Sequence, residues 1–169
     1  MARLHGITVP TPLGELTIVC SAEGVIATAF DDEEPAATID RIELAVGAPV
    51  VRGGGTTGAA RRDAEHYLAG RARTLAVPAD LSLVPEGFGR RVLETTATIP
   101  YGELWTYGDV AGMAGAPRAA RAAGSALARC PIELFVPCHR VVHASGTLGG
   151  YGRHEDRKRW LLRHEGAIA

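Results

Sequence analysis

The chain has 169 residues, of which 46% are hydrophobic and 22% charged, and its formal net charge is −1. This length is sufficient for one domain, or two small ones, with a hydrophobic core. A membrane helix needs about 20 consecutive apolar residues, and no apolar run in the sequence is close to that length. The first residues lack the apolar stretch of a secretory signal, and an odd count of three cysteines argues against a disulfide framework. We therefore expect a cytoplasmic protein with no membrane partner.

Charge is distributed unevenly along the chain. Residues 1–80 contain 7 Arg or Lys and 11 Asp or Glu, whereas residues 81–169 contain 11 and 8. Only the second half is suited to an anionic partner, and its positive excess is small for a nucleic-acid binder. The charge thus permits DNA binding without establishing it.

Residues 1–80 predict a small α/β domain. Alternating apolar and β-branched residues predict three strands, at 4–9, 15–21 and 25–30. Thr56 and Thr57 predict a capped helix that continues to Leu68 and ends at Gly70. The acidic run at 31–34 and the three glycines at 53–55 are interpreted as solvated loops. Residues 76–83 are interpreted as an edge strand or as a linker.

A second, mainly helical domain is expected over residues 81–169. Apolar residues at helical spacing from Phe88 onward predict a helix that ends before Pro100. Thr106 is suited to cap a helix over 107–113, and a second helix is expected with Pro117 near its start and its end near Ala128. Two short helices joined by a Gly-containing turn outline a helix-turn-helix, although similar pairs also occur in plain helical cores.

The segment from Ile132 to Val142 contains a cysteine followed directly by a histidine and an arginine. The thiolate is the reactive form of cysteine, so a nucleophilic Cys138 needs a neighbouring base or cation. Adjacent residues of a strand point to opposite sides, and Cys138 and His139 can therefore cooperate only if the backbone turns there or a water bridges them. A buried structural cysteine is the alternative.

A zinc site is an alternative interpretation of the same region. Cys130, Cys138, His139 and His143 can all bind zinc, but adjacent residues rarely reach one tetrahedral ion. We therefore expect no metal.

Seven short motifs in the second half occur in one order. That order and the separations between them closely resemble the O6-alkylguanine-DNA alkyltransferase family, also called methylated-DNA–protein-cysteine methyltransferases. The resemblance covers about residues 88–166, and in the first half it is limited to Thr11-Pro-Leu-Gly14. The motifs are Ile99-Pro-Tyr-Gly102, Thr106-Tyr107-Gly, Ala116-Pro-Arg-Ala-Ala-Arg121-Ala-Ala-Gly124, Val136-Pro-Cys-His-Arg-Val-Val142, Ala144-Ser-Gly146, Gly149-Gly-Tyr151-Gly, and Arg157-Lys-Arg-Trp-Leu-Leu162 with His164-Glu165.

The resemblance implies a single-use DNA-repair enzyme that irreversibly moves an alkyl group from O6-alkylguanine in DNA to Cys138. It implies that His139 takes the thiol proton through a water, that Glu165 orients His139, and that Tyr107 donates a hydrogen bond to guanine N3. It also implies an α/β domain followed by a mainly α domain with a winged-helix-like helix-turn-helix. No cofactor is implied, and a monomer is expected.

The implied partner is double-stranded DNA, bound in the minor groove with the damaged nucleotide flipped out of the stack. By resemblance Arg121 fills the gap left in the stack. The other expected DNA contacts are Thr106, Ala119, Ala120, Ala122 and Gly124, and the expected pocket residues are Pro137, Val141, Tyr151 and Gly152.

The chain departs from the family pattern in three places. Cys130 stands where an asparagine is usual, Glu133 where a small or apolar residue is usual, and Arg153-His154-Glu155 replaces a Gly-rich stretch. We expect these changes to slow transfer, to shift the preferred alkyl group, or to mark a specialised relative of the family. Two other functions stay open: an alkyltransferase-like protein that only flags the lesion, although such relatives lack the cysteine, and a cysteine enzyme acting on a small alkyl donor.

Overall fold

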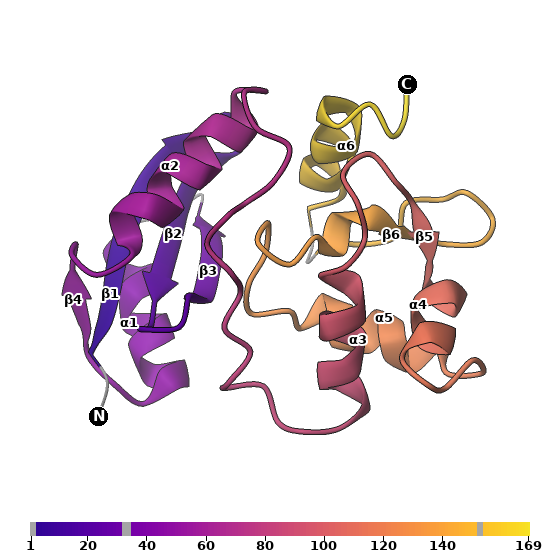
Figure 1. Ribbon diagram of the computed structural model, residues 1–169, viewed down its shortest axis with the longest axis horizontal. Coiled ribbons are helices and arrows are strands. Elements are labelled where there is room, and N and C mark those ends of the chain that lie inside the picture. The colour runs from indigo at the N-terminus through magenta and orange to yellow at the C-terminus, as the bar shows by residue number, and fades with distance from the viewer. Residues whose placement is uncertain (1–2, 32–34, 152–153) are drawn as a thin grey trace. The chain divides into compact units, whose positions relative to one another are not determined.

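The computed structural model describes residues 3–31, 35–151 and 154–169, and the chain divides into two compact units (Figure 1). The first unit contains Met1–Leu83 and Pro131–Phe135, and the second contains Val84–Cys130 and Val136–Ala169. The sequence-based division at residue 80 assumed a contiguous second domain. Pro131–Phe135 instead groups with the first unit, where the Thr28 amide donates to the Pro131 carbonyl and the Thr28 hydroxyl donates to the Glu133 carbonyl.

The first unit is built on a small mixed sheet in the order β3-β2-β1-β4. The first three strands are antiparallel neighbours and β4 pairs parallel to β1. Their bounds are β1 (Leu4–Thr11), β2 (Gly14–Cys20), β3 (Val25–Asp31) and β4 (Val50–Arg52). The three predicted strands are therefore present, whereas β4 was not predicted because three residues carry no readable alternation.

Two helices, α1 (Pro35–Val46) and α2 (Thr57–Leu68), cover opposite faces of this sheet (Figure 1). Leu4 of β1 packs in one core cluster with Ile42 of α1. The next residue, His5, points to the other face, where its Nδ1 lies 2.7 Å from the Gly53 carbonyl in the loop that leads to α2. Helix α1 was not predicted, although Ile39, Ile42 and Val46 have helical spacing. The expected Thr56 cap of α2 makes no side-chain capping hydrogen bond.

The second unit is mainly helical. Its elements are α3 (Phe88–Thr96), β5 (Trp105–Thr106), α4 (Tyr107–Met113), α5 (Ala120–Ala128), the 3-10 helix η1 (Cys138–Arg140), β6 (Val141–Val142) and α6 (Glu155–His164). The helices bury Val92, Val110, Ala123 and Leu161 completely. The two short strands β5 and β6 pair parallel to each other, and each leads directly into residues that line the candidate site.

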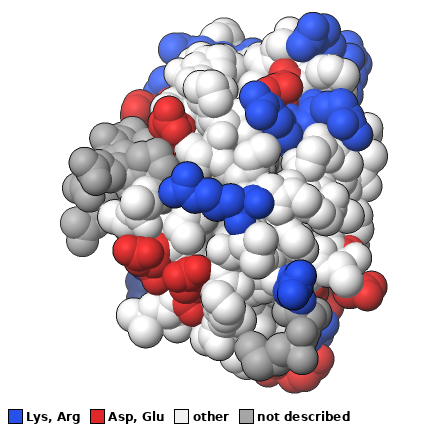
Figure 2. Space-filling view, turned by 90° about the vertical axis from the view of Figure 1, so that its left-hand side faces the viewer, with Lys and Arg blue, Asp and Glu red and all other residues white. Residues whose placement is uncertain are grey.

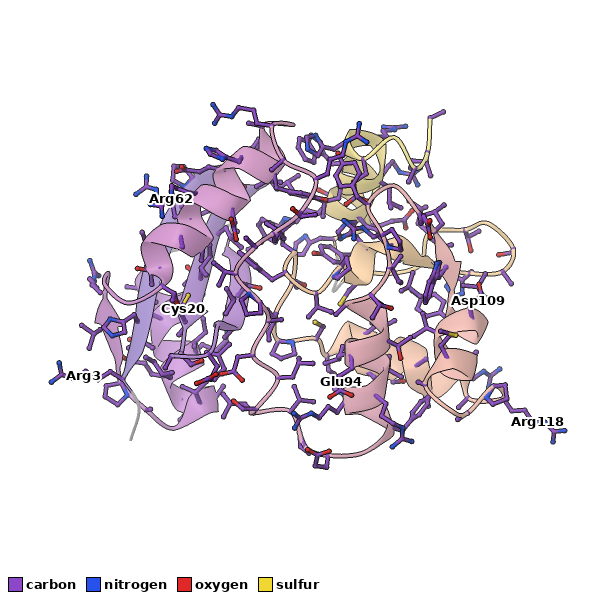
Figure 3. All side chains as sticks on the ribbon, in the orientation of Figure 1. Arg3, Cys20, Arg62, Glu94, Asp109 and Arg118 are labelled. Carbon is purple, nitrogen blue, oxygen red and sulfur yellow. The ribbon has the colours of Figure 1, made fainter. Side chains whose placement is uncertain are left out.

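Local signals explain where most of these elements begin. Thr106 caps α4 as predicted: its hydroxyl accepts from the Asp109 amide and the Asp109 carboxylate accepts from the Thr106 amide. In Figure 3, Asp109 lies at this end of α4 and Arg118 projects from the loop between α4 and α5. Helix α5 ends at Ala128 as predicted and begins at Ala120, three residues after Pro117. A turn closed by the hydrogen bond from the Ala119 amide to the Ala116 carbonyl lies between Pro117 and the helix.

Residues 76–83 form no strand; an isolated bridge between Val25 and Ala79 is their β contact, so the linker interpretation holds. No helix within the described ranges is both long and apolar enough to cross a membrane. Figure 2, which views Figure 1 from its left-hand side, shows Lys and Arg groups interspersed with Asp and Glu rather than gathered into one charged field.

Candidate active site

Cys138 begins a tight backbone turn. Pro137 precedes it with φ −79° and ψ 59°, the Cys138 amide donates to the Val136 carbonyl, and the Arg140 amide donates to the Pro137 carbonyl. In a 3-10 helix, successive side chains are about a third of a turn apart rather than on opposite sides. The backbone therefore turns where cooperation of Cys138 with the adjacent His139 requires it. Both side chains are buried, with Cys138 6% and His139 0% exposed.

Glu165, at the C-terminal end of α6, is the acceptor at the centre of a buried network. Its carboxylate lies 2.8 Å from His139 Nε2 and accepts from Arg140 Nε at 2.9 Å and Arg140 Nη2 at 2.7 Å. The Gly102 amide donates to the same carboxylate at 3.1 Å, and Arg140 Nη1 donates to the Ile99 carbonyl at 2.6 Å. Every side chain in this network is fixed by a partner from another element.

The electrostatics of this network favour a neutral imidazole. Burial lowers the pKa of His139, an effect that its hydrogen bond to Glu165 opposes and that the charges of Arg140 and Lys158 reinforce. A neutral histidine held by a carboxylate at one ring nitrogen can accept a proton at the other. The group can therefore serve as a base at neutral pH.

A second cluster of polar groups surrounds the phenol of Tyr107, the half-buried first residue of α4. Lys158 Nζ lies 3.5 Å from the Tyr107 hydroxyl, 5.6 Å from the ring centroid and 2.5 Å from the Val141 carbonyl, to which it donates. Burial lowers the pKa of Lys158 to about 8, opposed by the nearby Cys138 and Glu155 charges. Burial also raises the pKa of Tyr107, and Cys138 adds to the effect. The phenol thus remains a proton donor near neutral pH.

A cavity of about 500 Å³ opens beside Tyr107. Its other lining residues come from helix α5 and from the segment after β6: Ala120, Arg121, Gly124, Ser125, Ala128 and His143. Small side chains on α5 leave this cavity open, and a Cβ on Gly124 would meet the Tyr107 ring at 3.7 Å, an ordinary van der Waals contact. A volume of this size is typical of a site for one small ligand.

The remaining expected site residues are distributed around this centre. Of the expected DNA contacts, Ala119 and Ala122 lie outside the cavity lining, at the N-cap and on the exposed side of α5, and Thr106 caps α4. Among the expected pocket residues, Pro137 and Val141 are buried beside Cys138. Tyr151 presents its ring to that of His139 at 86°, with 6.3 Å between centroids. Gly152, and Arg153 of the departures, lie outside the described residues.

Sequence reasoning missed Arg140, Lys158 and His143 as site residues. Arg140 stands in the same tetrapeptide as Cys138, which is a usable signal. Lys158 stands between two arginines on α6 and reads as part of a solvated charged helix, so the sequence gives no sign of its complete burial. His143 was considered as a zinc ligand; its ring packs at a tilt against that of Tyr107, with 4.9 Å between centroids.

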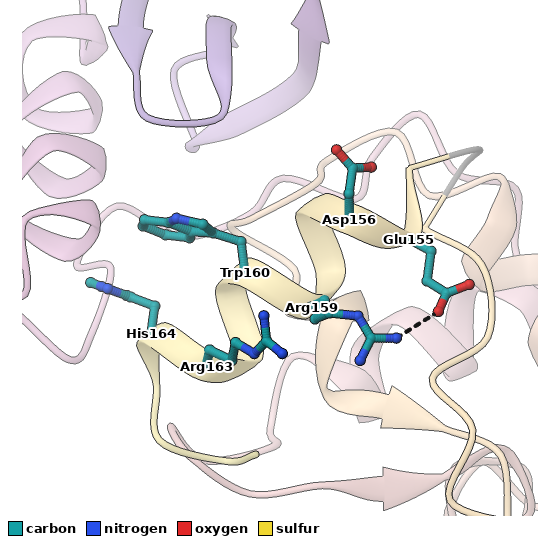
Figure 4. A pocket seen from close by; sticks show the side chains of 6 residues that line it. All are labelled: Glu155, Asp156, Arg159, Trp160, Arg163 and His164. Atoms are coloured by element: carbon teal, nitrogen blue, oxygen red, sulfur yellow. Dashed lines mark hydrogen bonds and ion pairs between the residues drawn. The ribbon is translucent and has the colours of Figure 1, made fainter. Parts of the chain in front are cut away.

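The opposite side of α6 carries a larger hollow, of about 680 Å³ (Figure 4). Trp160 stacks on His164 there, with ring centroids 4.8 Å apart and planes inclined by 15°. Glu155 pairs with Arg159, and both are well exposed. Because these charges are solvated or paired, they interact weakly. The hollow is therefore a weaker candidate for an active site than the buried groups on the other side of α6.

A thiol on a turn, beside a buried histidine that bonds a carboxylate, is the arrangement found in proteins that use a cysteine nucleophile. Residues 87–167 match the family model described as the 6-O-methylguanine DNA methyltransferase, DNA binding domain. The methylated-DNA–protein-cysteine methyltransferase of Salmonella typhimurium (strain LT2) is 37% identical over 177 residues, which cover 99% of this chain and 99% of that protein.

Solved structures agree with this relationship. The crystal structure of the Mycobacterium tuberculosis O6-methylguanine methyltransferase has a TM-score of 0.78 and 36% identity, covering 98% of this chain and 94% of that one. The Mycobacterium tuberculosis OGT in complex with DNA has a TM-score of 0.79 and 35% identity, covering 95% and 92%. The chain belongs to the methylated-DNA–protein-cysteine methyltransferase family.

Proposed function

We propose that this protein repairs O6-alkylguanine in double-stranded DNA by moving the alkyl group to the sulfur of Cys138, once per molecule. The observation that carries the proposal is the buried chain of contacts from Glu165 to His139 at the turn that holds Cys138, in a member of this family. In this reading the two units are an α/β N-terminal domain and a C-terminal domain that carries the chemistry and binds DNA.

The first step is removal of the thiol proton. We infer that it passes through a water to His139, whose low pKa keeps it neutral and able to accept. Glu165 then stabilises the imidazolium that forms, and Arg140 together with the Gly102 amide holds Glu165 in place. The charge that develops on His139 therefore meets a fixed carboxylate rather than an apolar wall.

The second step is displacement at the alkyl carbon. The thiolate forms a carbon–sulfur bond while the bond between that carbon and guanine O6 breaks, and the electron pair moves into the guanine ring. Tyr107, kept protonated by its raised pKa, donates its proton to guanine N3, so guanine leaves as a neutral base. The phenolate then regains a proton from solvent and the imidazolium of His139 releases one, which balances the reaction. The thioether that remains on Cys138 is not hydrolysed, which makes the reaction stoichiometric, and no cofactor takes part.

Helices α4 and α5 fit the proposed DNA-binding element, a helix-turn-helix of the winged-helix type. The target atom lies inside the base stack, so the nucleotide must flip out of the duplex. The cavity beside Tyr107 is large enough for a base, but its lining does not include Cys138. Arg121, which is exposed on α5 and belongs to that lining, is suited to fill the gap in the stack. Ala120 and Gly124 leave the helix slim enough to approach a minor groove. We place the protein in the reducing cytoplasm, because the acceptor must be a free thiol.

Intact-mass spectrometry with peptide mapping tests the proposal. The protein is mixed with duplex DNA that contains a single O6-methylguanine, and a gain of one methylene on the peptide that holds Cys138 is expected. Cys138→Ala should not gain mass yet should still bind the lesion, whereas Cys130→Ala should react like the parent. Lesion binding without a mass gain by the parent protein would indicate a damage-flagging protein. Neither binding nor a gain would indicate a substrate other than damaged DNA.

A further inference from the structure

The parallel pairing of β5 with β6 brings Tyr107 and His143 together. Trp105 pairs with Val141 and Thr106 pairs with Val142. Tyr107 directly follows β5 and His143 directly follows β6. Because the two strands are parallel and paired in register, these two residues lie next to each other. Their ring centroids are 4.9 Å apart and their planes are inclined by 50°, a geometry in which aromatic rings attract each other.

Gly149 shows how closely the polar ends of the two rings approach. Its φ is +76°, and a Cβ on it would lie 2.6 Å from the Tyr107 hydroxyl and 3.1 Å from His143 Nε2. Both atoms therefore crowd the same point, which is open only because Gly149 has no side chain. The hairpin that carries His143 is closed by two hydrogen bonds, from the His143 amide to the Thr147 carbonyl and from the Gly146 amide to the His143 carbonyl.

The other contacts of the Tyr107 phenol restrain its orientation only weakly. Tyr107 is only half-buried and opens onto the cavity that Arg121 also lines. Its hydroxyl lies 3.5 Å from Lys158 Nζ, the upper limit of a hydrogen bond, so that contact restrains the ring weakly. His143 is exposed and lines the same cavity, and its ring supplies the packing contact that limits where the phenol can point.

We propose that His143 is a positioning residue for Tyr107: its ring packs against the phenol and limits the directions in which the hydroxyl can point. The inference rests on the proposed function, since it concerns the proton that Tyr107 donates to the leaving guanine. Ring packing, rather than a proton of the imidazole, has this effect, and a phenylalanine at position 143 preserves it.

The test compares His143→Ala, His143→Phe and a matched control, Ser145→Ala. Ser145 is an exposed residue of the same hairpin, and its hydroxyl lies 3.1 Å from that of Thr147. Single-turnover transfer is measured from duplex DNA with O6-methylguanine and from the free base O6-benzylguanine. We expect His143→Ala to slow both reactions about tenfold or more, because small displacements of a catalytic group have large effects on rate. His143→Phe and Ser145→Ala should remain within about threefold of the parent.

A double-mutant cycle separates positioning from other roles. In a Tyr107→Phe background, His143→Ala should have no further effect, because the hydroxyl it positions is gone. The inference is overturned if His143→Ala reacts at the parent rate, if it slows only the duplex reaction, or if it slows transfer equally without the Tyr107 hydroxyl. Thermal unfolding confirms that the variants are folded. If the parent protein transfers from neither substrate, the proposed function itself fails.

Discussion

Replacing Glu165 with glutamine tests the buried network most directly. Glu165→Gln keeps the shape of the side chain and removes its charge, which leaves the Arg140 guanidinium, 11% exposed, without its anion. Removing one member of a buried ion pair costs about 3–5 kcal/mol. In a chain of this size each kcal/mol moves Tm by about 2–4 °C. We therefore expect Tm to fall by about 6–20 °C.

The same change should slow the chemistry. Without the carboxylate 2.8 Å from its Nε2, the buried His139 loses the group that stabilises its protonated form. Loss of the orienting carboxylate from comparable catalytic groups lowers rates on the order of 10²- to 10⁴-fold. The assay is single-turnover transfer from a duplex with one O6-methylguanine, followed by intact mass at a temperature where the variant stays folded. Urea unfolding gives the change in stability.

Glu94→Gln is the matched control for this experiment. Glu94, labelled on α3 in Figure 3, pairs with Arg90 at 3.1 Å and its side chain is 52% exposed. Exposed pairs of this kind contribute at most about 1 kcal/mol, so neither rate nor Tm should change much. If Glu165→Gln kept the parent rate and the parent Tm, the reasoning that ties Arg140, Glu165 and His139 together would be refuted.

Three further predictions concern other parts of the second unit. Arg121→Ala should lose transfer from duplex DNA while keeping transfer from free O6-benzylguanine; equal loss of both reactions would contradict the assignment of Arg121 to DNA. Thr106→Ala removes the capping box of α4 and should destabilise the protein by about 1 kcal/mol in urea unfolding, and an unchanged midpoint would count against it. For Lys158, the folded pKa of about 8 lies below the value of about 10.4 in an unfolded chain, so between these pH values the unfolded chain binds more protons. Stability should therefore rise for the parent relative to Lys158→Met as the pH increases from about 8 to 10, whereas parallel urea-unfolding curves would show that the ammonium is solvated.

Local patterns were enough to predict much of the secondary structure. The alternation of apolar residues located β1, β2 and β3, and Thr106 marked the start of α4, because these signals act over a few neighbouring residues. The same reasoning singled out Cys138 and His139, since a thiol and a base stand side by side in the chain. The two side chains can cooperate only if the backbone turns at Cys138. The sequence did not predict such a turn, and the structure shows one.

Only the tertiary structure decided which charged residues are buried. Lys158 lies in the highly charged helix α6, and Glu165 caps its C-terminal end. Yet Glu165 contacts His139 and Arg140, which stand 26 and 25 positions earlier, and Lys158 donates to the carbonyl of Val141. Neighbouring residues carry no information about such partners. The cost of burying a charge is offset by groups that are distant in sequence, so the network around the thiol exists only once the second unit has folded.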